Sequence, residues 1–168
     1  MAQPSKLIVA RENPSSLVHA ARTAMAAVVS YLIARLFRLP EAYWAPISTL
    51  IVMQSTLGAA LPISVQRFTG TAIGAAVGAA AATYFRGSVW AFGIAVFVIG
   101  MLCALLRVER SAYRYASITL TIVMLVTRST SAWLIAVHRF VEVSLGIAVG
   151  LLLSALWPEP QSGNLRRL

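Results

Sequence analysis

Charged residues are scarce in this chain of 168 residues. Only 11% of its positions are charged, with 14 Lys and Arg against five Asp and Glu, whereas an ordinary soluble domain has about 25%. Hydrophobic residues make up 59% of the chain, and the mean hydropathy is +0.79. A soluble chain of this length has too little interior to bury so much apolar surface. The composition therefore excludes a soluble globular domain and a disordered segment, and it predicts an integral membrane protein.

The residue types of metal, redox and hydrolytic chemistry are equally scarce. The single cysteine, Cys103, excludes a disulfide within the chain and a cysteine-cluster metal site. Only two histidines are present, His19 and His138, which argues against a histidine-rich centre. The chain lacks a Gly-x-Ser-x-Gly motif, a His-Glu-x-x-His motif, a P-loop and a pair of catalytic acids. We therefore expect no metal, no cofactor and no enzymatic activity.

Long apolar runs rich in Ala, Leu and Gly dominate what is present, without the ten-residue alternation of a membrane barrel. About 20 apolar residues are needed for a helix to cross a bilayer. The sequence predicts an all-α membrane protein with one domain over residues 15–158, between cytoplasmic segments 1–14 and 159–168. The six expected spans, separated by breaks such as Pro40-Glu41, Gly58 with Pro62, and Pro158, are Leu17–Phe37, Ala42–Leu57, Phe68–Phe85, Val89–Leu106, Tyr113–Val126 and Leu134–Trp157.

The net charge of +9 comes from basic residues that stand singly between the apolar runs. No basic block is present, which argues against a nucleic-acid partner. If the N-terminus is cytoplasmic, nine of the 14 basic residues fall on the inner side and five on the outer side. The positive-inside rule then predicts a multi-pass protein, surrounded by lipid, with both termini in the cytoplasm.

Two stretches of the sequence resemble each other. Residues Gln66–Gly78 and His138–Gly150 share Arg, Phe, Gly, Ala, Val and Gly at an offset of 72 residues. The second and fifth spans agree more weakly at an offset of 71. Because three spans separate the copies, the copies run in opposite directions. We predict a three-plus-three inverted-topology repeat, about 15–86 and 87–158, as in many secondary transporters; the alternative is chance recurrence of Gly and Ala in membrane helices.

Two arginines within the repeated stretches are candidates for function. Arg67 and Arg139 are expected one to two turns inside helices that start near Pro62 and Ser131, where a charge that faces lipid is costly. Snorkelling to the headgroups is the alternative. Their equivalent placement favours an anion site, assisted by helix N-termini. Glu142, three residues after Arg139, is interpreted first as its ion-pair partner and second as a proton-coupling carboxylate.

The second and fifth spans are short and polar, and they occupy equivalent places in the two halves. Such segments are the best sequence indication of a transport site, although Ser and Thr also form interhelical hydrogen bonds. Trp44 fits an interfacial belt and alternatively a stacking surface for a substrate ring. The candidate substrate-binding residues besides the arginines are Tyr43, Trp44, Ser48, Thr49, Gln54, Thr71, Ser117 and Thr119. Helix packing is predicted for Gly70, Gly74, Gly78, Gly146 and Gly150.

The segment Tyr43-Trp44-Ala45-Pro46-Ile47-Ser48, followed by Gln54 and then by Arg67-x-x-Gly70-Thr71-x-x-Gly74, resembles the fusaric acid resistance (FUSC) or aromatic acid exporter superfamily. Arg139 to Gly146 is similar to the closing part of the same domain. That superfamily includes bacterial aromatic carboxylate efflux components and plant aluminium-activated malate transporters. The resemblance implies a six-helix membrane domain that exports organic anions, with aromatic carboxylates as the leading substrate class.

Larger members of the superfamily are similar to two such units, or to one unit with soluble domains. For a single unit we therefore expect a partner subunit, with a homodimer as the first choice. Two alternatives to coupled transport stay open at this point. One is an organic-anion channel of the same fold, and the other is a membrane accessory or scaffold subunit that moves no anion.

Overall fold

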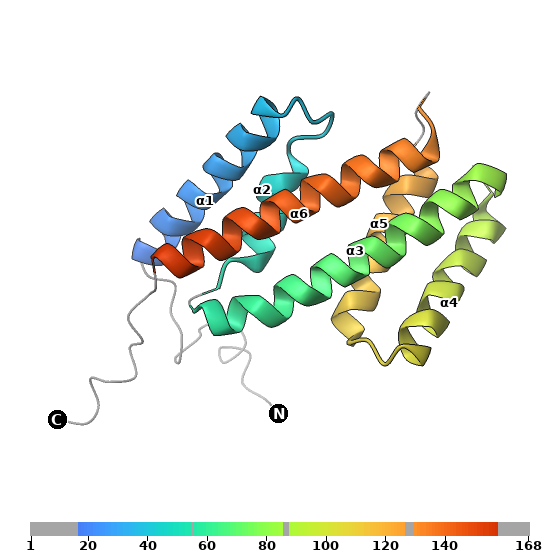
Figure 1. Ribbon diagram of the computed structural model, residues 1–168. Helices are drawn as coiled ribbons and strands as arrows, with labels where there is room; N and C mark the ends of the chain where they lie inside the picture. The colour runs from blue at the N-terminus through green and yellow to red at the C-terminus, as the bar shows by residue number, and fades with distance from the viewer. Residues whose placement is uncertain (1–16, 55, 86–87, 127–129, 158–168) are drawn as a thin grey trace, which may run out of the picture.

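The computed structural model describes residues 17–54, 56–85, 88–126 and 130–157, and within these ranges the chain is all-helical (Figure 1). The expected terminal segments, 1–14 and 159–168, lie outside the described residues. The same is true of Pro158 and of residues 86–87 and 128–129, where the sequence also indicates breaks between spans. The helices are α1 (Leu17–Leu36), α2 (Trp44–Val52), α3 (Leu57–Phe85), α4 (Val89–Leu105), α5 (Arg110–Leu125) and α6 (Ala132–Leu156).

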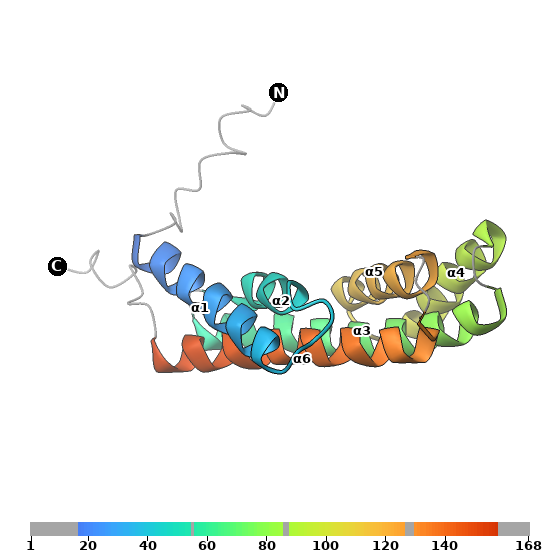
Figure 2. The same cartoon turned by 90° about the horizontal axis from the view of Figure 1, so that it is seen from above.

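The two longest helices, α3 and α6, lie side by side and run antiparallel (Figure 1). Seen from above, α2 and α5 cover one face of this pair, with α1 and α4 toward its two ends (Figure 2). Serine side chains start two of the helices: Ser88 accepts the amide of Ala91 and Ser131 that of Leu134, each at 3.3 Å. The arrangement brings α2, α3, α5 and α6 together at the centre of the molecule.

Three of the helices, α1, α3 and α6, are long and apolar enough to cross a membrane, and α4 is an apolar helix of 17 residues. The expected span Ala42–Leu57 is not a continuous helix. Its helical part, α2, has nine residues, which rise about 13 Å at 1.5 Å per residue, less than half of a hydrocarbon core of about 30 Å. The backbone leaves the helix at Met53, where ψ is 116°.

The prediction that Gly58 and Pro62 separate two helices is wrong, because both residues lie inside α3. The reason is the cap that precedes them: the Thr56 hydroxyl accepts the amide of Ala59 at 3.3 Å, and the Thr56 carbonyl accepts that of Ala60 at 3.1 Å. The helix therefore begins at Leu57, and Pro62 removes one bond near its start. As a consequence, Arg67 lies about three turns inside α3, deeper than expected.

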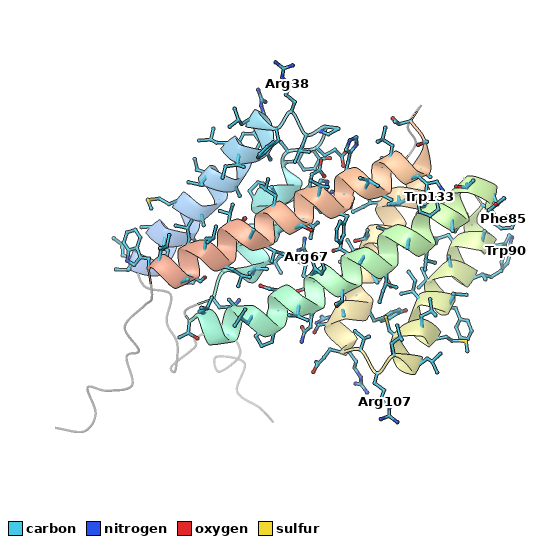
Figure 3. The ribbon with its side chains drawn as sticks, viewed as in Figure 1. Arg38, Arg67, Phe85, Trp90, Arg107 and Trp133 are labelled. Carbon is cyan, nitrogen blue, oxygen red and sulfur yellow. The ribbon has the colours of Figure 1, made fainter. Side chains whose placement is uncertain are left out.

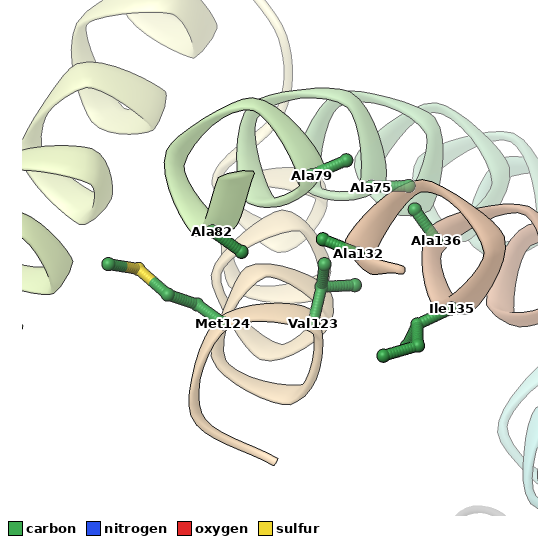
Figure 4. Packing of buried hydrophobic residues seen from close by; sticks show 8 residues of the cluster. All are labelled: Ala75, Ala79, Ala82, Val123, Met124, Ala132, Ile135 and Ala136. Atoms are coloured by element: carbon green, nitrogen blue, oxygen red, sulfur yellow. The ribbon is translucent and has the colours of Figure 1, made fainter. Parts of the chain in front are cut away.

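Small residues fill the contacts between the layers. Figure 4 shows a cluster of eight buried residues from α3, α5 and α6, five of them alanines: Ala75, Ala79, Ala82, Val123, Met124, Ala132, Ile135 and Ala136. Glycines permit the closest approaches. A Cβ atom on Gly74 would overlap the carbonyl oxygen of Ala116 in α5, and one on Gly146 would overlap that of Ala45 in α2. In lipid, where apolar burial supplies no force between helices, such backbone contacts hold a bundle together.

Candidate functional site

Two buried arginines lie where the long helices meet α2 and α5. Arg67 on α3 and Arg139 on α6 are 6% and 2% exposed, respectively. Figure 3 shows Arg67 in the middle of the molecule, far from the surface arginines Arg38 and Arg107. Their neighbours differ, although both guanidinium groups lie over aromatic rings.

Carboxylates surround Arg139. Its Nη2 donates to Glu41 Oε2 at 3.0 Å, and its Nη1 is 3.7 Å from Glu142 Oε2. The Glu142 Oε1 accepts the backbone amide of Glu41 at 2.9 Å, and Tyr43 donates its hydroxyl to Glu41 Oε1 at 2.8 Å. The Arg139 Cζ lies 3.8 Å from the centroid of the Trp44 ring. These contacts neutralise the arginine and fasten α6 to the residues before α2.

Arg67 has polar and aromatic neighbours instead. Its Nη2 donates to Ser48 Oγ at 3.1 Å, and its Cζ lies 5.0 Å from the centroid of the Tyr115 ring. Ser48 in turn donates to the Trp44 carbonyl at 2.9 Å. Within the described ranges no carboxylate forms an ion pair with Arg67, and its Nε has no acceptor. Among the described residues, this buried positive charge therefore has no counter-ion.

Two further buried donors, on α2 and α5, have no hydrogen-bond partner among the described residues. They are the indole Nε1 of Trp44, whose ring lies beside Arg139, and the hydroxyl of Ser117. A buried donor without an acceptor is costly, and such groups call for an explanation such as an absent ligand. Arg67 Nε is a donor of this kind at the centre of the molecule, and a guanidinium group is suited to an anion with several oxygens.

The other predicted site residues fall in different places. Thr49 donates to the Gly146 carbonyl at 2.9 Å and so belongs to the contact between α2 and α6. Thr119 donates to the Tyr115 carbonyl at 3.0 Å, and Thr71 is buried within α3. Gln54 follows α2 and contributes its backbone carbonyl to Arg22 at 2.5 Å. The structure thus brings Ser48 to Arg67, Tyr43 and Trp44 to Arg139, and Gln54 to neither.

Two residues of this centre, and one near the C-terminal end of α6, are not identified by the sequence. Glu41 is predicted only as part of a loop break, although it stands two residues before Tyr43. Tyr115 stands 71 residues after Trp44, so the offset between the second and fifth spans was a signal that could have identified it. Arg22 is fully buried and donates to the Trp157 carbonyl at 2.6 Å. Within the described ranges no three His, Cys, Asp or Glu side chains gather as metal ligands.

Comparison with known proteins gives a consistent result. The family described as fusaric acid resistance protein-like matches residues 26–153 of the chain. Inner membrane protein YeeA of Escherichia coli (strain K12) is 28% identical over 146 residues, which cover 85% of this chain and 41% of YeeA. The chain thus spans about two-fifths of the length of that relative. No solved structure matches.

Proposed function

Because the chain belongs to the fusaric acid resistance protein-like family, we propose that it exports small organic anions across a bacterial inner membrane. The family is one of membrane transporters, and its members are generally not enzymes. Aromatic carboxylates are the proposed substrates. A buried cation suits the carboxylate, and the rings of Trp44 and Tyr115 beside the two arginines suit an aromatic body.

The observation that carries this proposal is the state of Arg67. An ion taken out of water costs several kcal/mol unless a counter-charge accompanies it. Arg139 has that counter-charge from Glu41 and Glu142, whereas within the described part of the chain Arg67 has only the hydroxyl of Ser48 and the face of Tyr115. A substrate carboxylate would supply the missing charge and accept two guanidinium hydrogen bonds. Binding of the anion then also removes the free-energy cost of burying the Arg67 charge.

The proposed transport architecture is the three-plus-three inverted repeat, and the packing of glycines supports it. Gly74 approaches the carbonyl of Ala116, and Gly146, 72 positions after Gly74, approaches that of Ala45. Ala116 stands 71 positions after Ala45. The first half thus contributes α3 to a contact with α5, and the second half contributes α6 to the corresponding contact with α2.

The arginines follow the same correspondence. Arg67 lies over Tyr115 and Arg139 lies over Trp44, and the offsets between these partners are again 72 and 71. A proposed two-fold axis would pass where Phe68 and Phe140, themselves 72 residues apart, meet with ring centroids at 5.0 Å. Every such pair relates one half of the chain to the other.

The ends of α1 and α4 add a third correspondence. Arg38 and Arg107 are the two non-glycine residues of the described ranges with positive φ, each 52°. Each follows a helix, and in each case the next amide bonds back to a carbonyl five residues earlier: Leu39 to Ala34 and Val108 to Cys103. Figure 3 places the two arginines at opposite edges of the molecule, as opposed halves require.

In the proposed mechanism α2 and α5 line the path, because short helices at corresponding places are where such transporters bind substrate. One half rocks against the other and exposes Arg67 to each side in turn. Glu142, with Arg139 and Glu41, is the proposed link to protons. We propose that both termini are cytoplasmic and that a second copy completes the assembly, since the larger relative is more than twice as long.

The test is the flux of benzoate in proteoliposomes, measured with and without a pH gradient. Arg67→Gln should remove the flux while the protein still folds and inserts. Arg114→Gln is the matched control, because Arg114 is an exposed arginine of α5 whose hydrogen bond goes to Ser111. Equal loss of flux in both variants, or full flux in Arg67→Gln, would contradict the assignment of Arg67.

The same assay separates the two alternatives. A channel would pass benzoate down its electrochemical gradient at a rate that ignores the pH gradient. An accessory subunit would give no flux with any organic acid from folded protein, and it would co-purify tightly with a larger membrane partner.

A further inference from the structure

A cavity lies apart from Arg67, at the edge of the molecule where α1 ends and the chain turns toward α2. Its volume is about 410 Å³, and its lining residues are Tyr31, Arg35, Arg38, Leu39, Pro40, Ala42 and Tyr43. Two arginines and two tyrosines therefore surround it, and none of its lining residues is acidic. Another cavity lies between α3 and α4, with lining residues such as Val77 and Ile94, and it is by contrast almost wholly apolar.

The chemistry of this edge cavity favours an anion. The Arg35 Nη1 lies 3.4 Å from the Tyr31 hydroxyl, and its Cζ is 6.0 Å from the Tyr31 ring centroid. Neither Arg35 nor Arg38 forms an ion pair within the described ranges. The positive φ of Arg38 folds the chain back after α1, which brings both arginines to one small cavity. Guanidinium groups are suitable donors for a carboxylate, and so is the Tyr31 hydroxyl, which accepts from Arg35 and keeps its own proton to donate.

The cavity is also connected to the buried arginines. Tyr43, which lines it and is half exposed, donates its hydroxyl to Glu41 at 2.8 Å, and Glu41 pairs with Arg139 at 3.0 Å. One tyrosine and one carboxylate thus separate the cavity from the centre of the molecule. We propose that the cavity is a superficial carboxylate site, at which an aromatic carboxylate is held on its way to or from Arg67. The choice of ligand rests on the proposed function.

Arg107 provides an internal comparison. It has the same φ as Arg38 and the corresponding place after α4. The residues of α4 one turn before it are apolar, and Arg107 does not line this cavity. If exposed position and backbone conformation alone determined how an arginine binds anions, Arg38 and Arg107 would bind them equally. If the edge cavity is a binding site, Arg38 binds a carboxylate and Arg107 does not.

The experiment measures how fast phenylglyoxal modifies each arginine, resolved by mass spectrometry, in protein held in phosphatidylcholine nanodiscs. Benzoate is compared with chloride at equal ionic strength. We expect benzoate to slow modification of Arg35 and Arg38 several-fold and to leave Arg107 unchanged. The protection should persist in Arg67→Gln protein, because the edge cavity is separate from the deep site. A Tyr31→Phe variant, which keeps the ring and loses the hydroxyl, should weaken the protection.

Equal rates with benzoate and chloride at Arg35 and Arg38, or equal slowing at Arg107, would overturn the proposal. Protection that appears only when the discs contain phosphatidylglycerol would also overturn it, since the arginines would then hold a lipid headgroup. The measurement needs no flux. If Arg67→Gln protein transports normally, the proposed deep site fails while the protection result still decides the edge site, and the two failures are distinguishable.

Discussion

The surroundings of Arg139 and of Arg67 show how equivalent positions acquire different properties. Both arginines are buried on a long helix and both lie over an aromatic ring. Around Arg139, Glu41 and Glu142 supply negative charge. The positions that correspond to these acids around Arg67 are Ala112 and Gly70, which touch directly, so that a Cβ on Gly70 would overlap the Ala112 carbonyl.

The difference teaches that burial of an arginine does not by itself define a binding site. A paired arginine is part of the architecture, because removal of either member leaves a charge stranded in a medium of low dielectric constant. A buried arginine that has no carboxylate neighbour can still bind an anionic ligand. The comparison therefore predicts opposite outcomes when the same substitution is made at the two sites.

The largest expected effect is on stability. Arg139→Met should lower the free energy of unfolding by about 3–5 kcal/mol, because Glu41 and Glu142 lose the cation between them. Arg67→Met should leave it unchanged or raise it, because the substitution removes a buried charge and leaves no other charge stranded. Denaturation in detergent, followed by circular dichroism, measures both. A comparable loss in the two variants would show that Arg67 is as structural as Arg139.

The next effect tests whether the two halves pack alike. Gly74→Ala and Gly146→Ala should each lower stability by about 1–3 kcal/mol, because a Cβ forces the helices apart at the Ala116 and Ala45 carbonyls. Gly93→Ala is the matched control, since a Cβ there meets nothing within 4 Å. It should stabilise α4 by up to about 1 kcal/mol through helix propensity. Unequal losses at Gly74 and Gly146 would argue against the proposed repeat.

The next prediction gives Arg67 a carboxylate neighbour, as Arg139 already has. Ser48→Asp places a carboxylate where Arg67 now donates to a hydroxyl at 3.1 Å. We expect benzoate flux to fall about tenfold or more, equivalent to ~1.4 kcal/mol, with the fold retained. Ser48→Asn, which has nearly the same shape without the charge, should retain most of the flux. If both variants lose flux equally, the cause is steric and the comparison of the two arginines loses its functional meaning.

The smallest expected effect concerns the contact between the rings of Phe68 and Phe140. A double-mutant cycle of Phe68→Ala and Phe140→Ala should give a coupling of about 0.5–1.5 kcal/mol, the usual strength of an aromatic pair. The two single variants should lose similar stability, because each ring has the other as its counterpart across the proposed axis. A coupling near zero would place the axis elsewhere.

Much of the helical framework could be predicted from apolar runs alone. The ends of α1, α4 and α6 fall within about two residues of expectation, because charged or capping residues mark them. The expectation failed between residues 42 and 62. Hydropathy does not register that a helix stops at Val52, and Pro62 is tolerated because Thr56 caps the helix earlier.

The site was only partly predictable for a related reason. The repeat identified Arg67 and Arg139 as equivalent, since a sequence offset is visible in one chain. Which of them is paired depends on Glu41, which is 98 residues from Arg139 and reaches it only through tertiary contact. No local pattern contains that information. The ion pair within α6, between Arg139 and Glu142, follows by contrast from their spacing of three residues.

The contacts of Arg22 have a consequence for the order of synthesis. Its guanidinium donates to the carbonyls of Gln54 and Trp157, which are 32 and 135 residues downstream. When the ribosome has delivered only α1, neither of these two carbonyls has been made. The two bonds therefore form only after α2 and α6 have been synthesised, and the last helix to emerge completes the attachment of the first.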